Sequence, residues 1–351
     1  MPTDINQPGP HHKVSPEQVR QGFAEHLKRS EYPEDFPGVA HNAKPPEDRG
    51  FVIIHKDVTI TPGLRLRLST DPDSPTDCFL PCNLCGPSPK FKNNGYAILC
   101  DKGWIYFVGH DCAMAHYEGQ FSDAKKVFDR ETAERRAQEY FFENAGRIPA
   151  IVLRAQSLLE VAESYAPAHR EIKRHPTFRK TMRSAIVDNG GWLQVKQLQE
   201  VQLGNGVSVP REVTENFARI VGETAVRSEF AFDSVLRSNM QFLEGFGDTE
   251  EAVLQGVLAT QETGKLPQLH SAVLRATEAV NQARDGLAQF RLFFQPGNLE
   301  NIQRWLRLRD CPIQCRAEND KHVWWFRTMS TQKRRPIDTR VFAAPVPKSV
   351  A

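Results

Sequence analysis

The chain has 351 residues, which is long enough for more than one domain, and its 45 basic residues nearly balance its 43 acidic residues. The resulting formal charge of +2 gives no overall field that would favour nucleic acid or a membrane surface. Hydrophobic residues make up 40% of the chain, as in folded globular proteins, and no run of eighteen apolar residues predicts a membrane-spanning helix. We therefore expect a folded chain without a membrane partner.

The N-terminal part of the chain predicts one helix in an otherwise irregular segment. Residues 1–15 are rich in Pro, Gly, Asn and His, contain no apolar stretch typical of a signal peptide, and are expected to be disordered. Ser15 followed by Pro16 is typical of a helix start, and the helix should continue to about Arg29. Residues 31–50 are rich in Pro and acids, which predicts a linker.

Four short strands are expected next. Residues 51–55 and 64–68 lie on either side of a Thr-Pro-Gly turn, and residues 96–100 and 104–108 lie on either side of an Asp-Lys-Gly turn. Leucine and arginine alternate at 64–68, so one face of that strand should be buried and the other basic. We expect these strands to form a small sheet.

Cysteines concentrate in residues 78–119, which hold five of the seven in the chain. Cys82 and Cys85 are separated by two residues, the spacing with which a tight turn holds one metal ion. Cys112 and His116 are four residues apart near the start of a predicted helix, so they share one face of it. We predict a Zn²⁺ ion bound by Cys82, Cys85, Cys112 and His116.

Three further residues of this stretch are alternative ligands. His110 precedes the predicted helix and can replace His116, and Cys78 lies just before the cysteine turn. Cys100 ends a predicted strand on the same face as Tyr96 and can simply belong to the core. The alternative to any metal site is a set of buried free cysteines, which pack like small apolar residues.

The order of these features resembles the treble-clef family of zinc modules, in which a two-cysteine turn, a hairpin and a helix supply the ligands. The resemblance covers only residues 78–119, and it implies a structural zinc ion rather than a function for the whole chain. Four ligands would close the site, whereas a catalytic zinc keeps an open position. Pro81 before Cys82 also fits half of a nucleobase-deaminase signature, but no His-x-Glu precedes it, so we exclude that class.

From residue 121 the pattern becomes helical. Apolar residues recur at alternating steps of four and three over 148–166 and again over 269–294, the period of a coiled-coil seam. Because neither stripe can remain in water, we expect these helices to pack on each other, or in one bundle with a helix over 122–144. Further elements are expected at 176–187, 212–221, 227–244 and 298–308 (helices), at 199–209 (a hairpin) and at 322–327 (a strand).

Two stretches are locally basic. Residues 165–185 hold six basic residues against one acid, and residues 303–340 hold ten against four, interleaved with Trp305, Trp324 and Trp325. Arginines beside aromatic rings suit contact with a nucleic-acid backbone and stacking on bases, although solvated helix faces and core tryptophans are the alternative. The candidate residues are Arg170, Lys173, Arg174, Arg179, Lys180, Arg183, Lys333, Arg334 and Arg335.

Two cysteines near the C-terminus are expected to be buried free thiols. Cys311 and Cys315, with His322 after them, are an alternative second metal site, but their spacing suits a helix better than a metal-binding turn.

The sequence as a whole predicts an α+β fold, in which a small zinc-stabilised hairpin and helix precede a mainly helical body with long coiled-coil-like helices. The expected segments are a flexible 1–50 with one helix, a β-rich zinc module at 51–120, a helical bundle at 121–310 and a basic tail with a short strand at 311–351. The expected function is a zinc-binding scaffold or interaction protein whose partner is nucleic acid or protein; the alternative is an enzyme whose site in the helical body lacks short motifs. Clustered cysteines predict a reducing compartment, and hence the cytoplasm.

Overall fold

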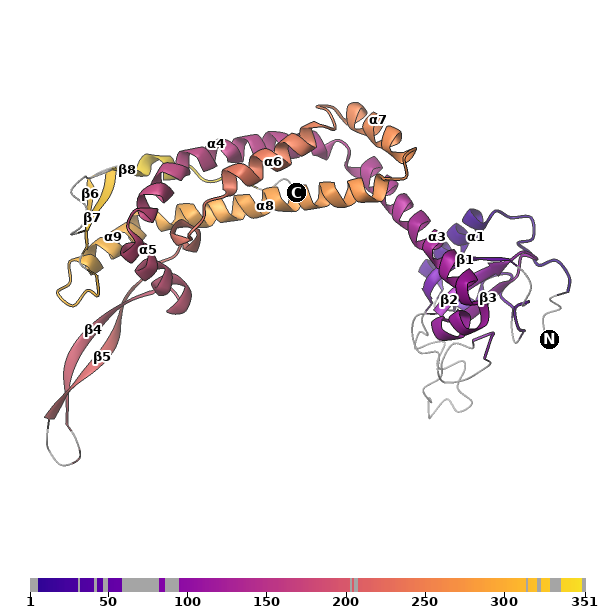
Figure 1. Ribbon diagram of the computed structural model, residues 1–351, viewed down its shortest axis with the longest axis horizontal. Coiled ribbons are helices and arrows are strands. Elements are labelled where there is room, and N and C mark those ends of the chain that lie inside the picture. Colours follow the sequence, from indigo (N-terminus) through magenta and orange to yellow (C-terminus); the bar gives the residue numbers. More distant parts are fainter. Residues whose placement is uncertain are drawn as a thin grey trace. The chain divides into compact units, whose positions relative to one another are not determined.

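The structure, a computed structural model, describes residues 6–30, 32–40, 43–46, 50–58, 82–85, 95–202, 204, 208–313, 315–320, 323–328 and 336–348. The chain forms two compact units, Met1–Arg136 and Ala137–Ala351 (Figure 1). Of the described residues, 58% are helical and 18% lie in strands of small sheets, which confirms the predicted α+β class. None of the described helices is both long enough and apolar enough to cross a membrane.

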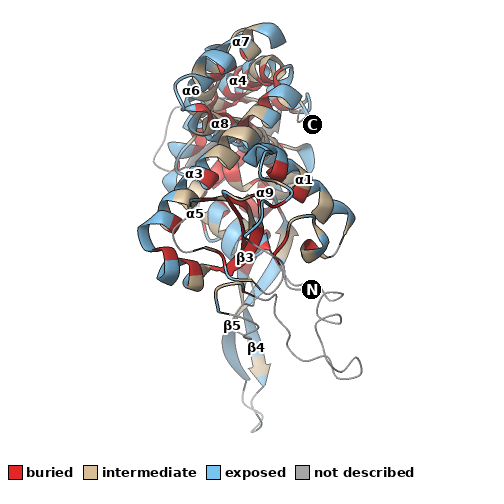
Figure 2. Cartoon of the chain, turned by 90° about the vertical axis from the view of Figure 1, so that its right-hand side faces the viewer, coloured by how far each residue is buried: buried red, intermediate tan, exposed pale blue. Residues whose placement is uncertain are grey.

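The first unit is built on a three-stranded antiparallel sheet in the order β1-β2-β3. Its strands are β1 (Phe51–Val58), β2 (Gly95–Cys100) and β3 (Ile105–Gly109). Helix α1 (Pro16–Arg29) covers one face through Val19 and Phe23, and helix α3 (His110–Asn144) covers the other. Because both faces are covered, every residue of β2 and β3 is buried (Figure 2). The predicted hairpin is confirmed, whereas the predicted strand at 64–68 lies outside the described residues.

The start of the described chain is more ordered than its composition suggests. Gly9 donates its backbone N–H to the Lys102 carbonyl at 2.7 Å, and the Trp104 indole donates to the Gln7 carbonyl at 2.9 Å. The turn between β2 and β3 therefore holds this segment in place. Gly103 of that turn has φ +79°, and only a residue without a side chain allows the close approach, because a Cβ there would lie 2.0 Å from the His12 backbone nitrogen. The prediction of disorder over residues 1–15 is wrong for residues 6–15, because backbone hydrogen bonds replace the missing apolar contacts.

The two helices of the first unit begin and break near their predicted positions. The helix start predicted at Ser15 and Pro16 is confirmed, and Ser15 and Gln18 form a capping box there. Helix α3 contains a non-helical residue, Glu118 (φ 43°, ψ −120°), directly before Gly119. It then resumes over the predicted 122–144 region.

The second unit has three long helices at its centre, α4 (Arg147–Lys173), α6 (Phe232–Glu244) and α8 (Leu266–Phe293). Helix α6 packs against both α4 and α8, and all three share one hydrophobic core (Figure 1). The apolar stripes of α4 and α8 are buried in this core, as expected for a bundle. A coiled coil of α4 and α8 stays a prediction, because α6 covers much of the apolar surface of these two helices.

Shorter elements complete this unit. Helix α5 (Pro176–Arg183) runs directly into a π-helical turn, η2 (Ser184–Asp188). Helix α9 (Pro296–Leu306) packs against a three-stranded sheet. Trp305 of the helix and Trp324 of the sheet are buried in the shared core, and they are 1% and 0% exposed. The remaining elements are η1 (Pro33–Asp35) in the first unit and, in the second, η3 (Glu223–Val226), α7 (Glu250–Gln261), α9 (Pro296–Leu306), β6 (Cys315–Asp320), β7 (Val323–Thr328), β8 (Ile337–Asp338) and η4 (Thr339–Phe342).

A two-stranded ribbon, β4 (Trp192–Gln202) and β5 (Ser208–Arg219), occupies the region where a helix at 212–221 was predicted. That prediction is wrong, because residues 212–219 belong to β5, in which Pro210 already pairs with Glu200. Pairing with β4 outweighs the local helix signal. Most of the ribbon is exposed, and Leu198 is 77% exposed (Figure 2).

Candidate metal centre

Three sulfur atoms converge at one edge of the first unit. Cys82 and Cys85 lie in a tight turn and Cys112 in the first turn of α3, and their Sγ atoms all lie within 4.8 Å of one another. No other described group of three or more His, Cys, Asp or Glu side chains is this close. The three cysteines can therefore hold a metal ion, and all three were predicted from the sequence.

Asn83 fixes the cysteine turn to the sheet. Its backbone N–H donates to the Phe107 carbonyl at 2.8 Å, and the Phe107 N–H donates to its Oδ1 at 2.7 Å. Its Nδ2 donates to the carbonyls of Ala40 and Ala43 at 3.0 and 2.9 Å. These four hydrogen bonds hold Cys82 and Cys85 beside strand β3.

Sequence reasoning missed this role for Asn83. The available signal was an asparagine between two metal-binding cysteines, since asparagine side chains often bond to nearby backbone in turns.

The thiol of Cys82 is arranged to ionise. Burial raises its pKa, but backbone amides of Gly109, Cys85 and Leu84 donate to the sulfur and together bring that pKa below its ordinary value. The N–H of Gly109, at the end of β3, lies 3.3 Å from Sγ. Amide donors of this kind stabilise a thiolate, which is the form that binds metal.

The pKa values of the other two thiols are raised in this arrangement of three sulfurs. Burial raises the pKa of Cys85, and burial together with the neighbouring sulfurs raises the pKa of Cys112 to about 12. Three adjacent thiolates repel one another, so only a bound cation makes the fully ionised form stable. The arrangement is that of a cation site formed by sulfur.

His116 is not part of this group. The residue is exposed, and its ring lies edge-on to the ring of Tyr117 with 4.8 Å between centroids. Tyr117 is buried against Phe51, which fixes that turn of the helix on the sheet. The structure thus brings together three of the four predicted ligands and places His116 one helical turn further on, in solvent.

The alternative ligands also lie away from the sulfur atoms. Cys100 belongs to the core on the Tyr96 side of the sheet, as its position in the strand suggested. The His110 ring lies 5.9 Å from the rings of both Tyr96 and Phe121, and its buried Nδ1 has no hydrogen-bond partner among the described residues. Cys78 lies outside the described residues.

The C-terminal cysteines form no comparable group in the described part of the chain. Cys311 is half-buried, and burial raises its pKa, while Cys315 is buried in β6. His322 lies outside the described residues.

The predicted nucleic-acid candidates are divided among several environments. Arg170, Lys173 and Arg174 lie at the end of α4, where Arg174 forms an ion pair with the buried Glu171 at 2.6 Å. The three basic residues of α5 have no carboxylate at ion-pair distance among the described residues. Lys333, Arg334 and Arg335 lie outside the described residues.

A site of three thiolates is chemically specific even before the metal is known. Soft sulfur ligands select zinc, copper(I) or iron over the hard cations that prefer oxygen. The geometry brings together three cysteines that could hold a metal ion, and it does not determine which metal. Comparisons of the chain with protein-family models, with curated proteins and with solved structures found no match.

Proposed function

We propose that the first unit folds around a structural zinc ion and that the protein is a scaffold or interaction protein. The convergence of three sulfurs from two separate segments, on a turn hydrogen-bonded to a hairpin, is the observation that supports this most directly. Zinc is redox-inert, binds thiolates well and commonly supplies folding energy in small modules. Reduced thiols of this kind persist in the cytoplasm, which is where we place the protein.

The arrangement supports a treble-clef-like module with His116 as the fourth ligand. The cysteine turn, the β2–β3 hairpin and the start of α3 follow one another as in that family, and His116 lies one helical turn beyond Cys112. A change of side-chain rotamer would turn its ring toward the sulfurs and complete a tetrahedral set. The absorption spectrum of the cobalt(II)-substituted protein tests this, because replacing His116 by Ala should change the ligand-field bands if its nitrogen binds the metal.

Metal analysis of the purified full-length protein tests the zinc site itself. We expect about one zinc per chain, and less than about half of that in Cys112→Ser. Cys311→Ser is the matched control, because it removes a half-buried thiol from the other unit and should leave zinc unchanged. A wild-type protein with less than half an equivalent, or a Cys112→Ser variant with a full one, would refute the proposal.

Nucleic-acid binding by the second unit is a second candidate function. It is favoured by Arg179, Lys180 and Arg183, which lie on one short helix without ion-pair partners among the described residues. The other basic stretch has less support than before, because Trp305 and Trp324 belong to the core and cannot stack on bases. Binding that weakens steeply with salt is the expected result.

The enzyme alternative stays a prediction. The described residues lining a groove of the helical body beside α5 include Ser228 and Glu229 but no histidine or cysteine. A serine beside an acid is not the nucleophile-and-base pair that covalent hydrolases use.

A further inference from the structure

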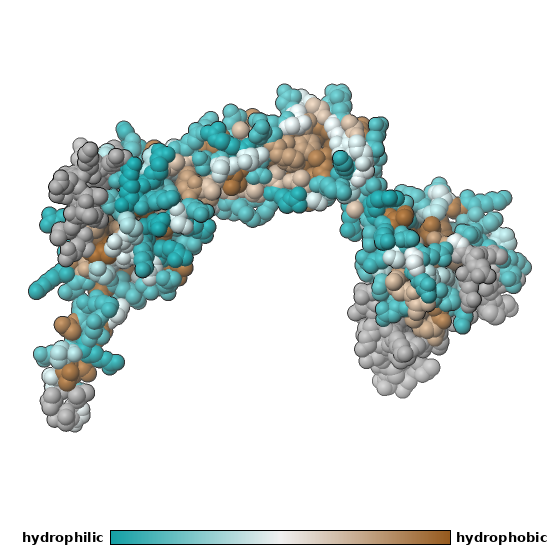
Figure 3. All heavy atoms as spheres, viewed as in Figure 1, coloured by the Kyte–Doolittle hydropathy of each residue, from teal (hydrophilic) through white to brown (hydrophobic). Residues whose placement is uncertain are grey.

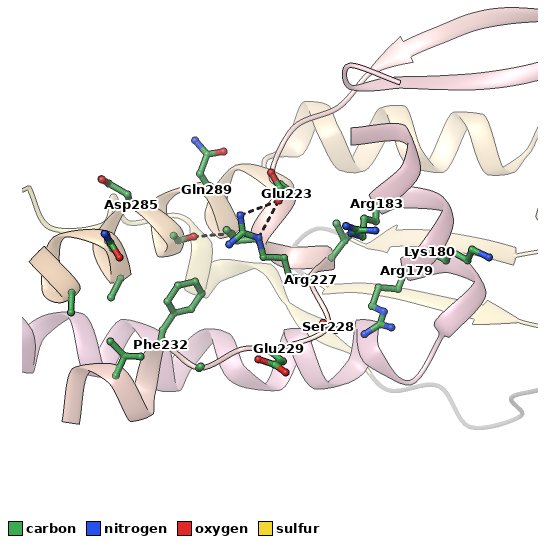
Figure 4. Close-up of a pocket in the computed structure, with 18 of the residues that line it drawn as sticks. Arg179, Lys180, Arg183, Glu223, Arg227, Ser228, Glu229, Phe232, Asp285 and Gln289 are labelled. Atoms are coloured by element: carbon green, nitrogen blue, oxygen red, sulfur yellow. Dashed lines mark hydrogen bonds and ion pairs between the residues drawn. The ribbon is translucent and has the colours of Figure 1, made fainter. Parts of the chain in front are cut away.

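A groove of about 1210 Å³ lies beside α5 in the second unit (Figure 4). Its walls come from three parts of the chain: α5, the segment 223–235 that includes η3, and one side of α8. The groove is lined on the α5 side by Arg179, Lys180 and Arg183. In Figure 4 Arg227 lies between these residues and Phe232, which is on the other side.

The orientation of α5 is fixed by its apolar residues. Phe178 and Met182 are fully buried, so the helix cannot rotate its basic residues into the core. Arg179 is half-buried, whereas Lys180 and Arg183 are exposed at the groove. The π-helical turn η2 follows directly, and such turns are frequent at functional sites.

Charge at the groove is unbalanced in favour of cations. Glu223 is neutralised by Arg227, with hydrogen bonds of 3.0 and 3.1 Å, and Asp285 forms an ion pair with Arg284. Glu229 is then the lining acid without an ion pair among the described residues. Three cations of α5 against this single acid leave the groove positive, which favours an anionic ligand.

The side opposite α5 offers an aromatic ring and amides. Phe232 is half-buried, and its ring packs so closely on α8 that a Cβ at Gly286 would lie 2.3 Å from it. Gln282 and Gln289 are exposed on α8, two helical turns apart along the same groove. An aromatic face and amide groups are the means by which proteins bind unpaired bases.

We propose that this groove binds a segment of single-stranded nucleic acid, with phosphates at Arg179, Lys180 and Arg183 and a base against Phe232. The inference rests on the second candidate function and names its site and its substrate class. The groove is larger than the roughly 300–1,000 Å³ of pockets for drug-sized molecules, so it suits an extended ligand. Cations on one side and a ring on the other match a strand, whose backbone and bases lie on separate edges.

Fluorescence anisotropy with a labelled single strand of about twelve nucleotides tests the proposal. The variant Arg179→Gln/Lys180→Gln/Arg183→Gln should bind at least about tenfold more weakly, and the slope of log K against log salt should fall in magnitude by about 2. The matched control is Arg147→Gln/Lys265→Gln/Arg275→Gln, which removes the same three charges from exposed positions of the same unit outside the groove. Its affinity should stay within about threefold of wild type.

Phe232 provides a second, charge-independent measurement. Phe232→Leu should weaken binding about fivefold or more, and Phe232→Tyr should restore it, because stacking needs a ring rather than apolar volume. Thermal unfolding of both variants checks that the fold is retained. If Leu at this position binds as well as Phe, no base stacks there and the proposal is overturned.

The remaining outcomes separate this site from the broader function. Equal losses in the two triple variants would show that binding is diffuse, which overturns the groove and leaves nucleic-acid binding intact. No binding by the wild-type protein would overturn both. Complete competition by adenosine monophosphate would assign the groove to a free nucleotide and overturn the proposal of a strand.

Discussion

Asn83 links the chemistry of the metal centre to the sheet, because it bonds to β3 and to the segment at Ala40 while its neighbours supply sulfur. Asn83→Ala removes three side-chain hydrogen bonds next to two ligands, and residues of this kind typically alter metal affinity by about 10–100-fold. We expect a loss in that range, measured by competition with a chromogenic chelator. Asn83→Asp keeps the acceptor for Phe107 and should lie between wild type and Ala; equal affinity of all three proteins would contradict the proposed role.

His169 makes the stability of the second unit depend on pH. It is 3% exposed, its Nε2 lies 3.0 Å from the Arg227 carbonyl, and burial lowers its pKa, with Lys173 and Arg179 acting in the same direction. The unfolded chain therefore binds the proton more readily than the folded one. Stability from the neutral ring is fully present above the ordinary histidine pKa of 6.5 and is lost as pH falls through the lower folded pKa.

Urea unfolding at a series of pH values tests this. As the pH falls below about 6.5, toward the lowered pKa of the folded state, the wild-type free energy of unfolding should decrease by up to about 1.4 kcal/mol per pH unit because of this group. His169→Gln cannot titrate, so its profile should be flatter over the same interval. Parallel profiles would show that His169 is not responsible.

At the scale of elements, the connection from the ribbon to η3 depends on one glycine. Gly222 has φ +103°, and a Cβ there would lie 2.4 Å from the Phe293 nitrogen at the end of α8. Gly222→Ala combines backbone strain with a clash and should destabilise the second unit by at least about 2 kcal/mol. Gly190→Ala is the control, because φ is +61° with no atom near the added Cβ, and it should cost only about 1–2 kcal/mol. Chemical denaturation compares the two, and equal losses would exclude the clash.

Elements that depend on local signals were predictable from the sequence. The capping box of α1, the β2–β3 hairpin and the apolar stripe of α8 all follow from residues close together in the chain. The helix expected at 212–221 was wrong because the strand depends on pairing with β4, and a single sequence does not reveal that pairing.

The features of the two sites that the sequence did not predict depend on contacts between residues far apart in the chain. The three clustered cysteines were predicted from spacing, but the hydrogen bonds of Asn83 to Phe107 and Ala40 join positions far apart in the chain. The groove could not be predicted either, because α5 and Phe232 come together only through packing of the helical body. Basic residues on α5 were visible in the sequence, but the absence of ion-pair partners for them within the described part of the chain was not.

At the scale of the whole molecule, the proposed metal site lies within one of two compact units. All three sulfurs lie in Met1–Arg136, and the helical core lies in Ala137–Ala351. Removal of metal should therefore abolish or lower the unfolding transition of the first unit and leave that of the second in place, since binding energy contributes to the unit that binds. Differential scanning calorimetry with and without chelator measures this. Equal shifts of both transitions would show that the units do not respond independently to the metal.

The exposed ribbon of β4 and β5 has a consequence for how this chain can vary. Its outer residues contribute little to the core, and hydrophobic residues are interspersed with hydrophilic ones along it (Figure 3). Side chains alternate with a period of two, so adding or deleting two residues in each strand preserves which side every remaining residue faces. Homologous chains can thus differ in ribbon length by even steps, and the same property makes this hairpin a suitable place to insert a reporter peptide.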